Sequence, residues 1–402
     1  MKLPKAAWQR RDGMKPLLAA LDAKGGATRY VGGCVRDTLL GLEVSDIDLA
    51  TRLTPQEVIE RLGKARIKAI PTGIAHGTVT AVAAGQPIEV TTLRRDVATD
   101  GRRATIAYTG DWREDAARRD FTINALFADP VSLEVHDYFG GEADLAARHV
   151  RFIGDPLTRI AEDHLRILRF FRFHARFGQG EADAEALAAC TDRANDLMAL
   201  SRERIADELT KLLALPAPVA AVAMMVERGI LRPVLPEIGA EGVARLERLV
   251  RREAEAGIAP HPLRRLAALL PPEPETVAAV AARLRLSNRS AKRLATAAKR
   301  SSTEPDSPER LAYRIGTDEA ADRILLGDGD PAAVAALGTW QRPRLRLGGG
   351  DLLAMGLTAG PVVAKTLQAI EREWMEAGFP GEAGTQRAIA RRHVDQALRD
   401  RQ

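Results

Sequence analysis

Cysteine, aromatic residues and long apolar runs are all scarce in this chain. Its 402 residues include two cysteines, Cys34 and Cys190, too few for a disulfide framework or a structural zinc site. We therefore expect a reducing compartment and a cytoplasmic location. No segment approaches the roughly 18 consecutive apolar residues that a membrane span requires, and MKLPKAAWQRRDGMK lacks the apolar core of a signal peptide. We expect no membrane association.

Aromatic side chains make up 4% of the chain, which disfavours an RNA-binding surface that works mainly by stacking on bases. The formal net charge of +5 is modest for this length, so the positions of the cations matter more than their number. Basic clusters lie at 94–95, 102–103, 118–119, 166–176 and 288–300. They fit a polyanionic partner held mainly through phosphates, although 288–300 fits a solvated helix face equally well.

Two kinds of periodicity divide the chain. Between residues 27 and 150, β-rich runs such as GTVTAVAA and PIEVTTL alternate with helical patterns such as TPQEVIERLGKA. In that helix Thr54 is the expected N-cap and Glu57 completes a capping box. From about residue 155 onward the pattern is helical. The sequence thus predicts an α+β protein, with an α/β head followed by a long all-helical body and tail.

Short stretches rich in Gly, Pro and Ser interrupt the helical pattern and indicate the expected boundaries. At this length we expect two to four packed units, and no feature indicates an obligate protein partner. The predicted parts are an N-terminal helical extension at 1–26, a head at 27–150, a neck at 151–215, a body at 216–300 and a tail at 301–402.

Three acidic residues of the head are candidates for a metal site. Asp46 and Asp48 lie two apart in SDIDLAT, so on a strand both side chains would project from the same face. Two carboxylates together with phosphate and water suit Mg²⁺. Glu89 sits between Ile88 and Val90 in a second strand pattern and would complete a two-metal site for nucleotidyl transfer. For a bare DxD pattern, a turn aspartate is the commoner explanation.

The preceding run, VGGCVRDTLLG, favours the site over the turn. Gly32 and Gly33 follow a strand and open a helix, where backbone N–H groups can approach phosphate oxygens without interference from a Cβ. Arg36 would add a charged fork to the same phosphates.

The segment EDHLRILRFFRFHARF places a ladder of charges on one expected helix. Residues three apart are neighbours on a helix, so Asp163, Arg166, Arg169 and Arg172 would form an oblique row on its surface. The apolar residues on the rest of that helix surface would pack into a core. Such a charge run is usually a solvated helix face, and Asp163 with Arg166 is then an exposed ion pair worth a few tenths of a kcal/mol.

The alternative is that Asp163 and Arg166 read a nucleobase. An acceptor beside a donor matches the Watson–Crick edges of cytosine and adenine, whereas guanine and uracil present the reversed polarity. A buried mismatch leaves polar groups unpaired, at a cost of about 1 to 3 kcal/mol each. This pair would therefore admit C and A and reject G and U without a nucleic-acid template.

A further candidate segment is RRDFTINAL. Arg119 can hold phosphate, and Asp120 or Asn124 can hydrogen-bond a ribose hydroxyl. The simpler alternative is that residues 118–120 form a surface ion pair and that Asn124 caps a helix.

The same residues carry a family resemblance. VGGCVRDTLLGLEVSDIDLAT, PIEVTTLRRD, RRDFTINALFAD, EDHLRILRFFRF and SRERIADELTKLL resemble, in order, the motifs of class II tRNA nucleotidyltransferases. That family comprises CCA-adding enzymes and bacterial poly(A) polymerases of the polymerase β superfamily. The resemblance covers about residues 27 to 215. It implies a polymerase β-like nucleotidyltransferase head with a mixed β-sheet, followed by an all-α neck, body and tail.

The resemblance also implies roles for single residues. Asp46 and Asp48 would bind the catalytic metals, with Glu89 in the place of a third carboxylate. Gly33, Arg36 and Arg119 would contact the nucleotide. The family's EDxxR motif falls on Glu162, Asp163 and Arg166, and the family's nucleotide-contacting arginines fall on Arg169 and Arg172.

The expected activity is addition of C, C and A to the 3′ end of tRNA, from CTP and ATP with Mg²⁺, releasing pyrophosphate. Residues 99–115 would form a flexible loop that permits the switch from C to A. The nearest alternatives are a poly(A) polymerase and an enzyme that adds only A to tRNA. From other classes, we consider nucleotidyl transfer to a small molecule and a catalytically silent RNA-binding protein.

Overall fold

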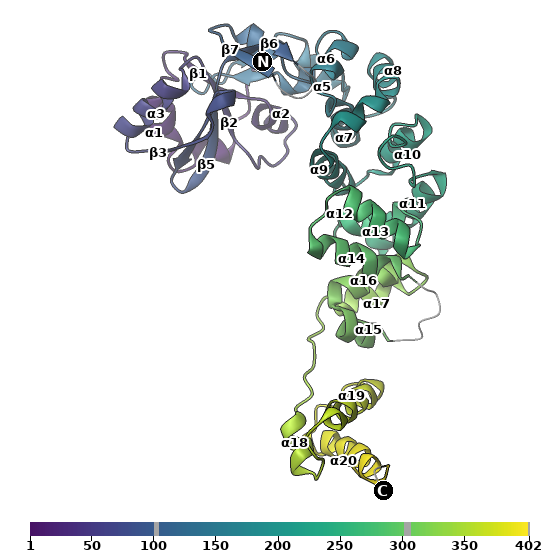
Figure 1. The fold of residues 1–402 in the computed structure, drawn as a ribbon. Coiled ribbons are helices and arrows are strands. Elements are labelled where there is room, and N and C mark those ends of the chain that lie inside the picture. Colours follow the sequence, from purple (N-terminus) through teal and green to yellow (C-terminus); the bar gives the residue numbers. More distant parts are fainter. Residues whose placement is uncertain (100–103, 301–306, 401–402) are drawn as a thin grey trace. The chain divides into compact units, whose positions relative to one another are not determined.

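The computed structural model describes residues 1–99, 104–300 and 307–400 (Figure 1). The chain forms two compact units. The first contains Met1–Val243 with Arg283–Arg285, and the second contains Ala244–Ala282 with Leu286–Gln402. The predicted division into five parts is finer than these units and stays a prediction.

A seven-stranded mixed sheet forms the centre of the first unit, which confirms the predicted α+β head. The strand order is β3-β4-β5-β2-β1-β8-β9. β2 runs parallel to β5, whereas the other neighbouring strands are antiparallel. The strands are β1 (Thr28–Val31), β2 (Asp48–Thr51), β3 (Lys68–Gly73), β4 (Thr78–Ala83), β5 (Gln86–Thr92), β8 (Phe127–Ala128) and β9 (Val135–His136). A separate hairpin pairs β6 (Arg94–Thr99) with β7 (Ala104–Tyr108).

Short helices surround this sheet. The predicted cap of α3 is present, because Thr54 Oγ1 accepts from the backbone N–H of Glu57 and Glu57 Oε2 accepts from the N–H of Thr54 at 2.7 Å. The head contains η1 (Ala7–Arg10), α1 (Met14–Ala20), α2 (Gly33–Leu39), α3 (Pro55–Lys64), η2 (Ile74–His76), α4 (Trp112–Ala117), η3 (Thr122–Asn124) and α5 (Gly141–Ala146).

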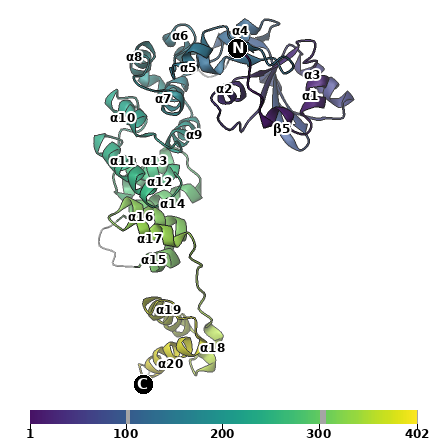
Figure 2. The same cartoon turned by 180° about the vertical axis from the view of Figure 1, so that it is seen from behind.

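Helices complete the first unit, and phenylalanine rings join α7 to the head. Phe121, which precedes η3, lies 5.1 Å from Phe173 between ring centroids, and Phe152 lies 5.9 Å from Phe170. Figure 2 shows α7 beside α9 and α10. These helices are α6 (Pro156–Glu162), α7 (Arg166–Phe177), α8 (Ala184–Asp192), η4 (Ala194–Ala199), α9 (Arg202–Leu213) and α10 (Val219–Glu227).

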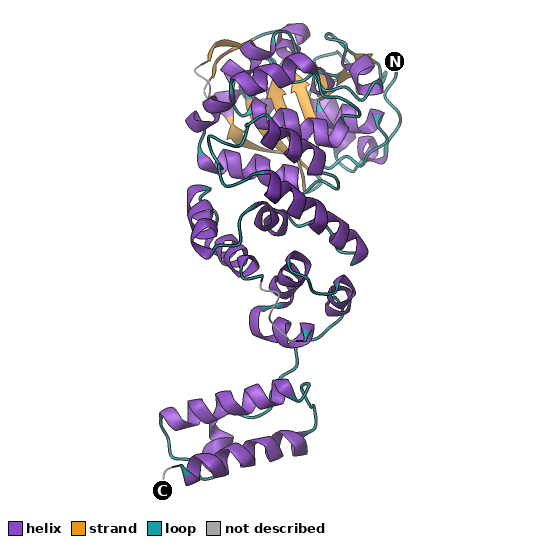
Figure 3. Ribbon diagram, turned by 90° about the vertical axis from the view of Figure 1, so that its right-hand side faces the viewer, coloured by secondary structure: helices purple, strands orange, loops and turns teal. Residues whose placement is uncertain are grey.

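In its described residues the second unit contains helices joined by loops and no strand, as Figure 3 shows. Near its end α19 packs along α20, with Trp374 buried between them and α18. α11 (Ala240–Glu255) crosses from the first unit into the second. The other helices are α12 (Pro262–Leu269), α13 (Pro274–Arg283), α14 (Asn288–Ala298), α15 (Pro308–Ile315), α16 (Thr317–Leu326), α17 (Pro331–Leu337), α18 (Gly349–Ala354), α19 (Pro361–Glu376) and α20 (Ala383–Arg399).

Two of the cations at 288–300 have structural partners. Arg293 Nε lies 2.6 Å from a carboxylate oxygen of the buried Asp322. Arg300 donates to the carbonyl oxygens of Ala267 and Leu270 at 2.8 and 2.9 Å. Part of this cluster is therefore internal to the helical packing. Within the ranges that the structure describes, no helix is long and apolar enough to cross a membrane.

Candidate active site

The glycine pair forms a tight turn between β1 and α2. Gly32 has φ of +70°, in the region that favours glycine, and a Cβ there would lie 3.4 Å from Arg119 Nη1. Gly33 is the first residue of α2. One turn later the side chain of Arg36 is buried and donates to Asn124 Oδ1. The turn therefore brings backbone and two arginines to one place.

The three acidic candidates meet at the start of the parallel strand pair. Asp48 opens β2, and its partner in the register with β5 is Glu89. Asp46 lies before the strand, with an exposed side chain that accepts from Ser45 Oγ at 2.8 Å. The expectation that both aspartates share one strand was wrong, because pairing of β1 with β2 reaches only Leu49 and the chain before Asp48 is irregular.

The electrostatics of Asp48 fit a cation-binding role. Burial raises the pKa of Asp48 to about 6, and the negative charges of Glu89 and Asp46 add to this rise, whereas Arg119 opposes it. A carboxylate that is both buried and beside other anions is costly to ionise without a positive neighbour. No group of three His, Cys, Asp or Glu side chains in the described part of the chain is arranged to hold a metal ion. The site thus offers Asp48 and Glu89 as two neighbouring carboxylates, rather than a complete set of metal ligands.

Ten of the predicted residues line one open pocket of about 440 Å³. Arg118, Leu165, Phe173 and Arg204 complete its lining. Asp46, Glu89 and Arg172 are not part of the lining. The ten are Gly32, Gly33, Arg36, Asp48, Arg119, Asp120, Asn124, Asp163, Arg166 and Arg169.

The expected continuous helix that would carry Asp163, Arg166, Arg169 and Arg172 is interrupted at Asp163. α6 ends at Glu162, and Asp163 has an extended backbone with φ of −153° and ψ of 105°. α7 then begins at Arg166. The prediction that Asp163 and Arg166 neighbour each other on one helix was therefore wrong. Asp163 instead accepts the backbone N–H of Leu165 at 3.1 Å, an Asx-type contact that competes with the helix.

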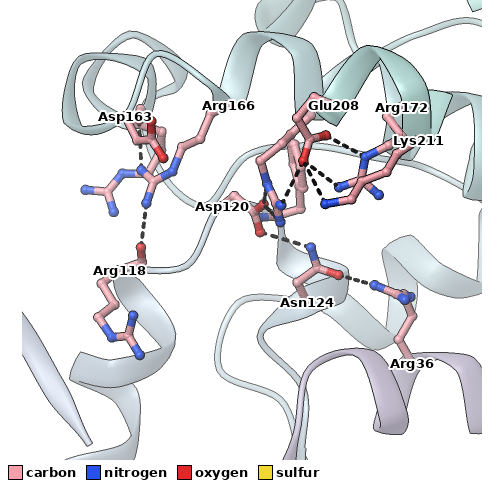
Figure 4. A network of polar contacts seen from close by, with 12 residues as sticks. Arg36, Arg118, Asp120, Asn124, Asp163, Arg166, Arg172, Glu208 and Lys211 are labelled. Atoms are coloured by element: carbon pink, nitrogen blue, oxygen red, sulfur yellow. Dashed lines mark hydrogen bonds and ion pairs between the residues drawn. The ribbon is translucent and has the colours of Figure 1, made fainter. Parts of the chain in front are cut away.

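Both proposed base-reading side chains are held by neighbours (Figure 4). Nη2 of Arg204, on α9, donates to both carboxylate oxygens of Asp163 at 3.0 and 2.8 Å. The guanidinium of Arg166 donates to the carbonyl oxygens of Arg118 and Arg159, each at 2.8 Å, and pairs with Glu162. Neither side chain is a freely solvated surface charge, and the two form no ion pair with each other among the described contacts.

A second network of polar contacts holds Arg169 and Arg172 (Figure 4). Arg169 pairs with Asp120 at 2.6 Å, and Asn124 donates to the same aspartate at 2.9 Å. Although burial alone would raise it, these two partners lower the pKa of Asp120 to about 2. Arg172 points to Glu208 instead, with Nε 2.6 Å from a carboxylate oxygen. Asp120 and Asn124 thus connect Arg169 to Arg36 rather than forming a surface pair or a helix cap.

Three residues of the site had no predicted role. Asp115 is 1% exposed and pairs with Arg118 and Arg119 at 2.8 and 3.0 Å. Arg204 and Glu208 lie one turn apart on α9 and hold Asp163 and Arg172. The spacing of four residues in SRERIADEL was a signal that both side chains share a helix face. What the sequence did not show was which element lies opposite that face.

The predicted loop at 99–115 is only partly described. Residues 100–103 lie outside the described residues, and Ala104–Tyr108 form β7, paired with β6. Asp111 then caps α4, its side chain accepting from the N–H of Arg113 at 2.8 Å. The expectation of one loop through residue 115 was therefore wrong for its second half.

Comparison with known proteins identifies the family. A model described as the poly A polymerase head domain matches residues 28–151, and one described as a probable RNA and SrmB-binding site of polymerase A matches 182–241. The chain is 34% identical over 400 residues to mitochondrial CCA tRNA nucleotidyltransferase 1 of Mus musculus, covering 94% of this chain and 90% of that protein. The chain belongs to the class II tRNA nucleotidyltransferase and poly(A) polymerase family.

Other members of this nucleotidyltransferase family match along most of the chain. The CCA-adding enzyme of Limosilactobacillus fermentum is 32% identical over 378 residues, which cover 90% of this chain and 92% of that enzyme. A crystal structure of the Bacillus stearothermophilus CCA-adding enzyme in complex with CTP superposes with a TM-score of 0.74 at 25% identity, covering 97% of this chain and 100% of that one. The predicted family and fold are thus confirmed.

Proposed function

We propose that this chain is a CCA tRNA nucleotidyltransferase that adds C, C and A to the 3′ end of tRNA from CTP and ATP. The observation that carries the proposal is one pocket that joins the glycine turn, Asp48 and the pair of Asp163 and Arg166. The groups that we propose to bind phosphate, to bind metal and to read the base therefore face the same space. The relatives named above are CCA-adding enzymes, and they match this chain over about its full length. They favour this activity over poly(A) synthesis.

The carboxylates supply the catalytic chemistry in this proposal. Asp48, with its raised pKa, and the neighbouring Asp46 offer hard oxygen donors that fit Mg²⁺ together with phosphate and water. Bound Mg²⁺ would lower the pKa of an attacking ribose hydroxyl and neutralise charge on the triphosphate. We keep Glu89 as a third carboxylate, because it lies opposite Asp48 in the strand register.

The chain's cations orient the nucleotide. The turn at Gly32 and Gly33 lets backbone N–H groups approach phosphate, with Arg36 and Arg119 beside it. Arg169 lines the same pocket and would contact the nucleotide. Arg172 does not line the pocket and would act indirectly, through its ion pair with Glu208. The proposed ribose contact of Asp120 or Asn124 would be made beside existing hydrogen bonds, which both oxygens of Asp120 accept.

Base selection rests on Asp163 and Arg166. Their neighbours fix both side chains before a nucleotide arrives, so little ordering is left to be done on binding. An acceptor and a donor held in this way match cytosine and adenine and oppose the reversed polarity of guanine and uracil. A buried mismatch costs about 1 to 3 kcal/mol per unpaired group.

The test incubates the protein with tRNA transcripts that end before CCA, after C or after CC, with each NTP supplied separately and with Mg²⁺. We expect C, C and A to be added in order and addition then to stop. A long A tail beyond the CCA end would show poly(A) synthesis instead, and addition of A alone would show an A-adding enzyme. Asp46→Ala should abolish transfer from every NTP, whereas Glu43→Gln, exposed in the same irregular segment, should not.

The cytoplasmic location also stays a proposal, based on the small number of cysteines. Both thiols are buried and free. Imaging of the tagged full chain in its own cells would test this location.

A further inference from the structure

A second pocket lies on the head, among residues with no role in the proposed reaction. The N-terminal segment, α1 and the turn between β8 and β9 enclose an open pocket of about 460 Å³. Leu18, Ala23 and Leu133 give it an apolar floor, and Val131 stands at its edge with its side chain 64% exposed. The floor and edge of this N-terminal pocket are thus mostly aliphatic.

The rim of the N-terminal pocket carries only positive charge. Lys5, Arg10, Lys15 and Lys24 line it and are exposed, and no aspartate or glutamate is among its lining residues. No ion pair joins any of the four to another residue in the described ranges. Four uncompensated cations around one apolar floor are a local excess that the modest charge of the whole chain does not require.

The walls of this pocket are fixed by specific contacts. The backbone N–H of Leu3 donates to the carbonyl oxygen of Leu133 at 2.7 Å, and the Trp8 ring packs edge-on against Tyr30 with centroids 4.7 Å apart. Asp129 Oδ1 accepts from the N–H of Val131 at 2.8 Å and so holds that apolar side chain outward. Leu133 has φ of +61°, a strained conformation for a non-glycine residue. The exposed apolar edge is therefore held in place by the surrounding turn.

We propose that the N-terminal pocket binds an acidic peptide segment of another protein, with aliphatic side chains on the floor and carboxylates against the four cations. An aliphatic floor with an exposed valine at its edge has no role in holding a phosphate backbone, and binding of single-stranded RNA bases needs an exposed ring. Tyr30, the only aromatic lining residue, is 1% exposed and covered by Trp8. An acidic amphipathic helix meets both parts of the pocket.

The experiment measures fluorescence anisotropy of a labelled synthetic peptide with glutamates and with leucines on one helical face, added to the full chain. Lys15→Glu with Lys24→Glu should weaken binding about tenfold, because like charges then face each other. Val131→Ser should weaken it as well. Lys68→Glu, an equally exposed lysine on β3, is the matched control and should bind as the unchanged chain does.

Two further probes decide the class of partner. A peptide with serine in place of every leucine should bind more weakly than the first peptide, and a single-stranded RNA of similar charge should not compete for the pocket. The opposite result is that the RNA competes with the peptide and that this competition disappears in the variant with Lys15→Glu and Lys24→Glu. That result would show a nucleic-acid surface and overturn the proposal. Unchanged peptide binding in both pocket variants would overturn it too. Nucleotide addition should be the same in all variants, so this test is independent of the proposed activity.

Discussion

Arg204 holds Asp163 with a single nitrogen, Nη2, which lies 3.0 Å from Oδ1 and 2.8 Å from Oδ2. Asp163 sits in the break between α6 and α7, where its backbone is extended and its carbonyl oxygen accepts only a turn-type hydrogen bond from the N–H of Arg166 at 3.0 Å. The contact therefore ties a side chain in an irregular segment to the regular helix α9. If Asp163 reads the base, then Arg204 is the residue that sets its position.

Replacing Arg204 by alanine should damage the choice among nucleotides. Without the contact, Asp163 can rotate, and its fit to the amino groups of cytosine and adenine is lost. We expect the preference for CTP and ATP over UTP and GTP to fall about tenfold, which corresponds to about 1.4 kcal/mol. Steady-state kcat/KM for each NTP measures this change.

Two variants separate positioning from general damage. Arg204→Lys keeps a positive charge near Asp163 and should restore part of the discrimination. Arg228→Ala removes an exposed arginine just after α10 and should leave the preference unchanged. A normal preference in Arg204→Ala, with only a uniform loss of rate, would contradict the positioning role.

The half-buried Asp48 should make stability depend on pH in the direction opposite to most carboxylates. Its pKa is raised from 3.8 to about 6 in the folded chain, so the folded state holds the proton more tightly than the unfolded state. Stability should therefore fall as the pH rises between these two values. Asp48→Asn, which resembles the protonated form, should be more stable than the unchanged chain at about pH 8, by about 3 kcal/mol.

Thermal melting in EDTA at several pH values measures this difference. It should vanish below the ordinary carboxyl pKa of 3.8, because Asp48 is then protonated in both states. Asp46→Asn, at an exposed position, should melt close to the unchanged chain and gain only slightly in stability at high pH, because it removes one of the weaker causes of the raised pKa of Asp48. Added Mg²⁺ should raise the melting temperature of the unchanged chain and not that of Asp48→Asn. A less stable Asp48→Asn at high pH would show that the charged carboxylate is already well paired.

Glu208→Gln should weaken nucleotide binding without altering nucleotide choice. Glu208 is 3% exposed and lies 2.6 Å from Arg172 and 3.8 Å from Arg169. Neutralising it leaves a buried guanidinium without a counter-charge, at a cost of about 3 kcal/mol in unfolding free energy. The KM values for CTP and ATP should rise together, because Arg169, which lines the pocket, loses one of its two carboxylate partners.

Urea unfolding and initial-rate kinetics measure these two effects. Asp207→Asn is the matched control, since Asp207 precedes Glu208 on the same helix but is 61% exposed and pairs with Lys211. It should change the free energy of unfolding by less than about 1 kcal/mol. A change in the ratio of CTP to ATP use in Glu208→Gln would mean that α9 acts on base selection through more than Arg204.

Local patterns predicted the elements better than the contacts between them. The capping box at Thr54 follows from spacing, and the strand patterns that hold Asp48 and Glu89 follow from alternation; the structure has all of these. The break at Asp163 was missed because the Leu/Arg/Phe pattern continues through it, and only the Asx contact to Leu165 reveals the competing backbone geometry. Arg204 lies 41 residues from Asp163, a pairing that no local period encodes.

In the second unit, Asp322→Asn should destabilise the helical packing strongly. Asp322 is fully buried on α16 and accepts from Arg264 at 2.7 Å and from Arg293 at 2.6 Å. Removing its charge leaves both guanidinium groups without this shared carboxylate, and Arg264 is itself only 4% exposed. Loss of one member of a buried ionic network costs about 3 to 5 kcal/mol.

Asp318→Asn is the matched control for this change. Asp318 lies one turn earlier on the same helix and 3.4 Å from the same Arg293, but its side chain is 72% exposed. It should cost less than about 1 kcal/mol, because water screens the pair. Hydrogen exchange of the amides in α12, α14 and α16 measures both effects, since these helices pack on one another. Equal protection in the two variants would show that Asp322 contributes no more than a surface charge does.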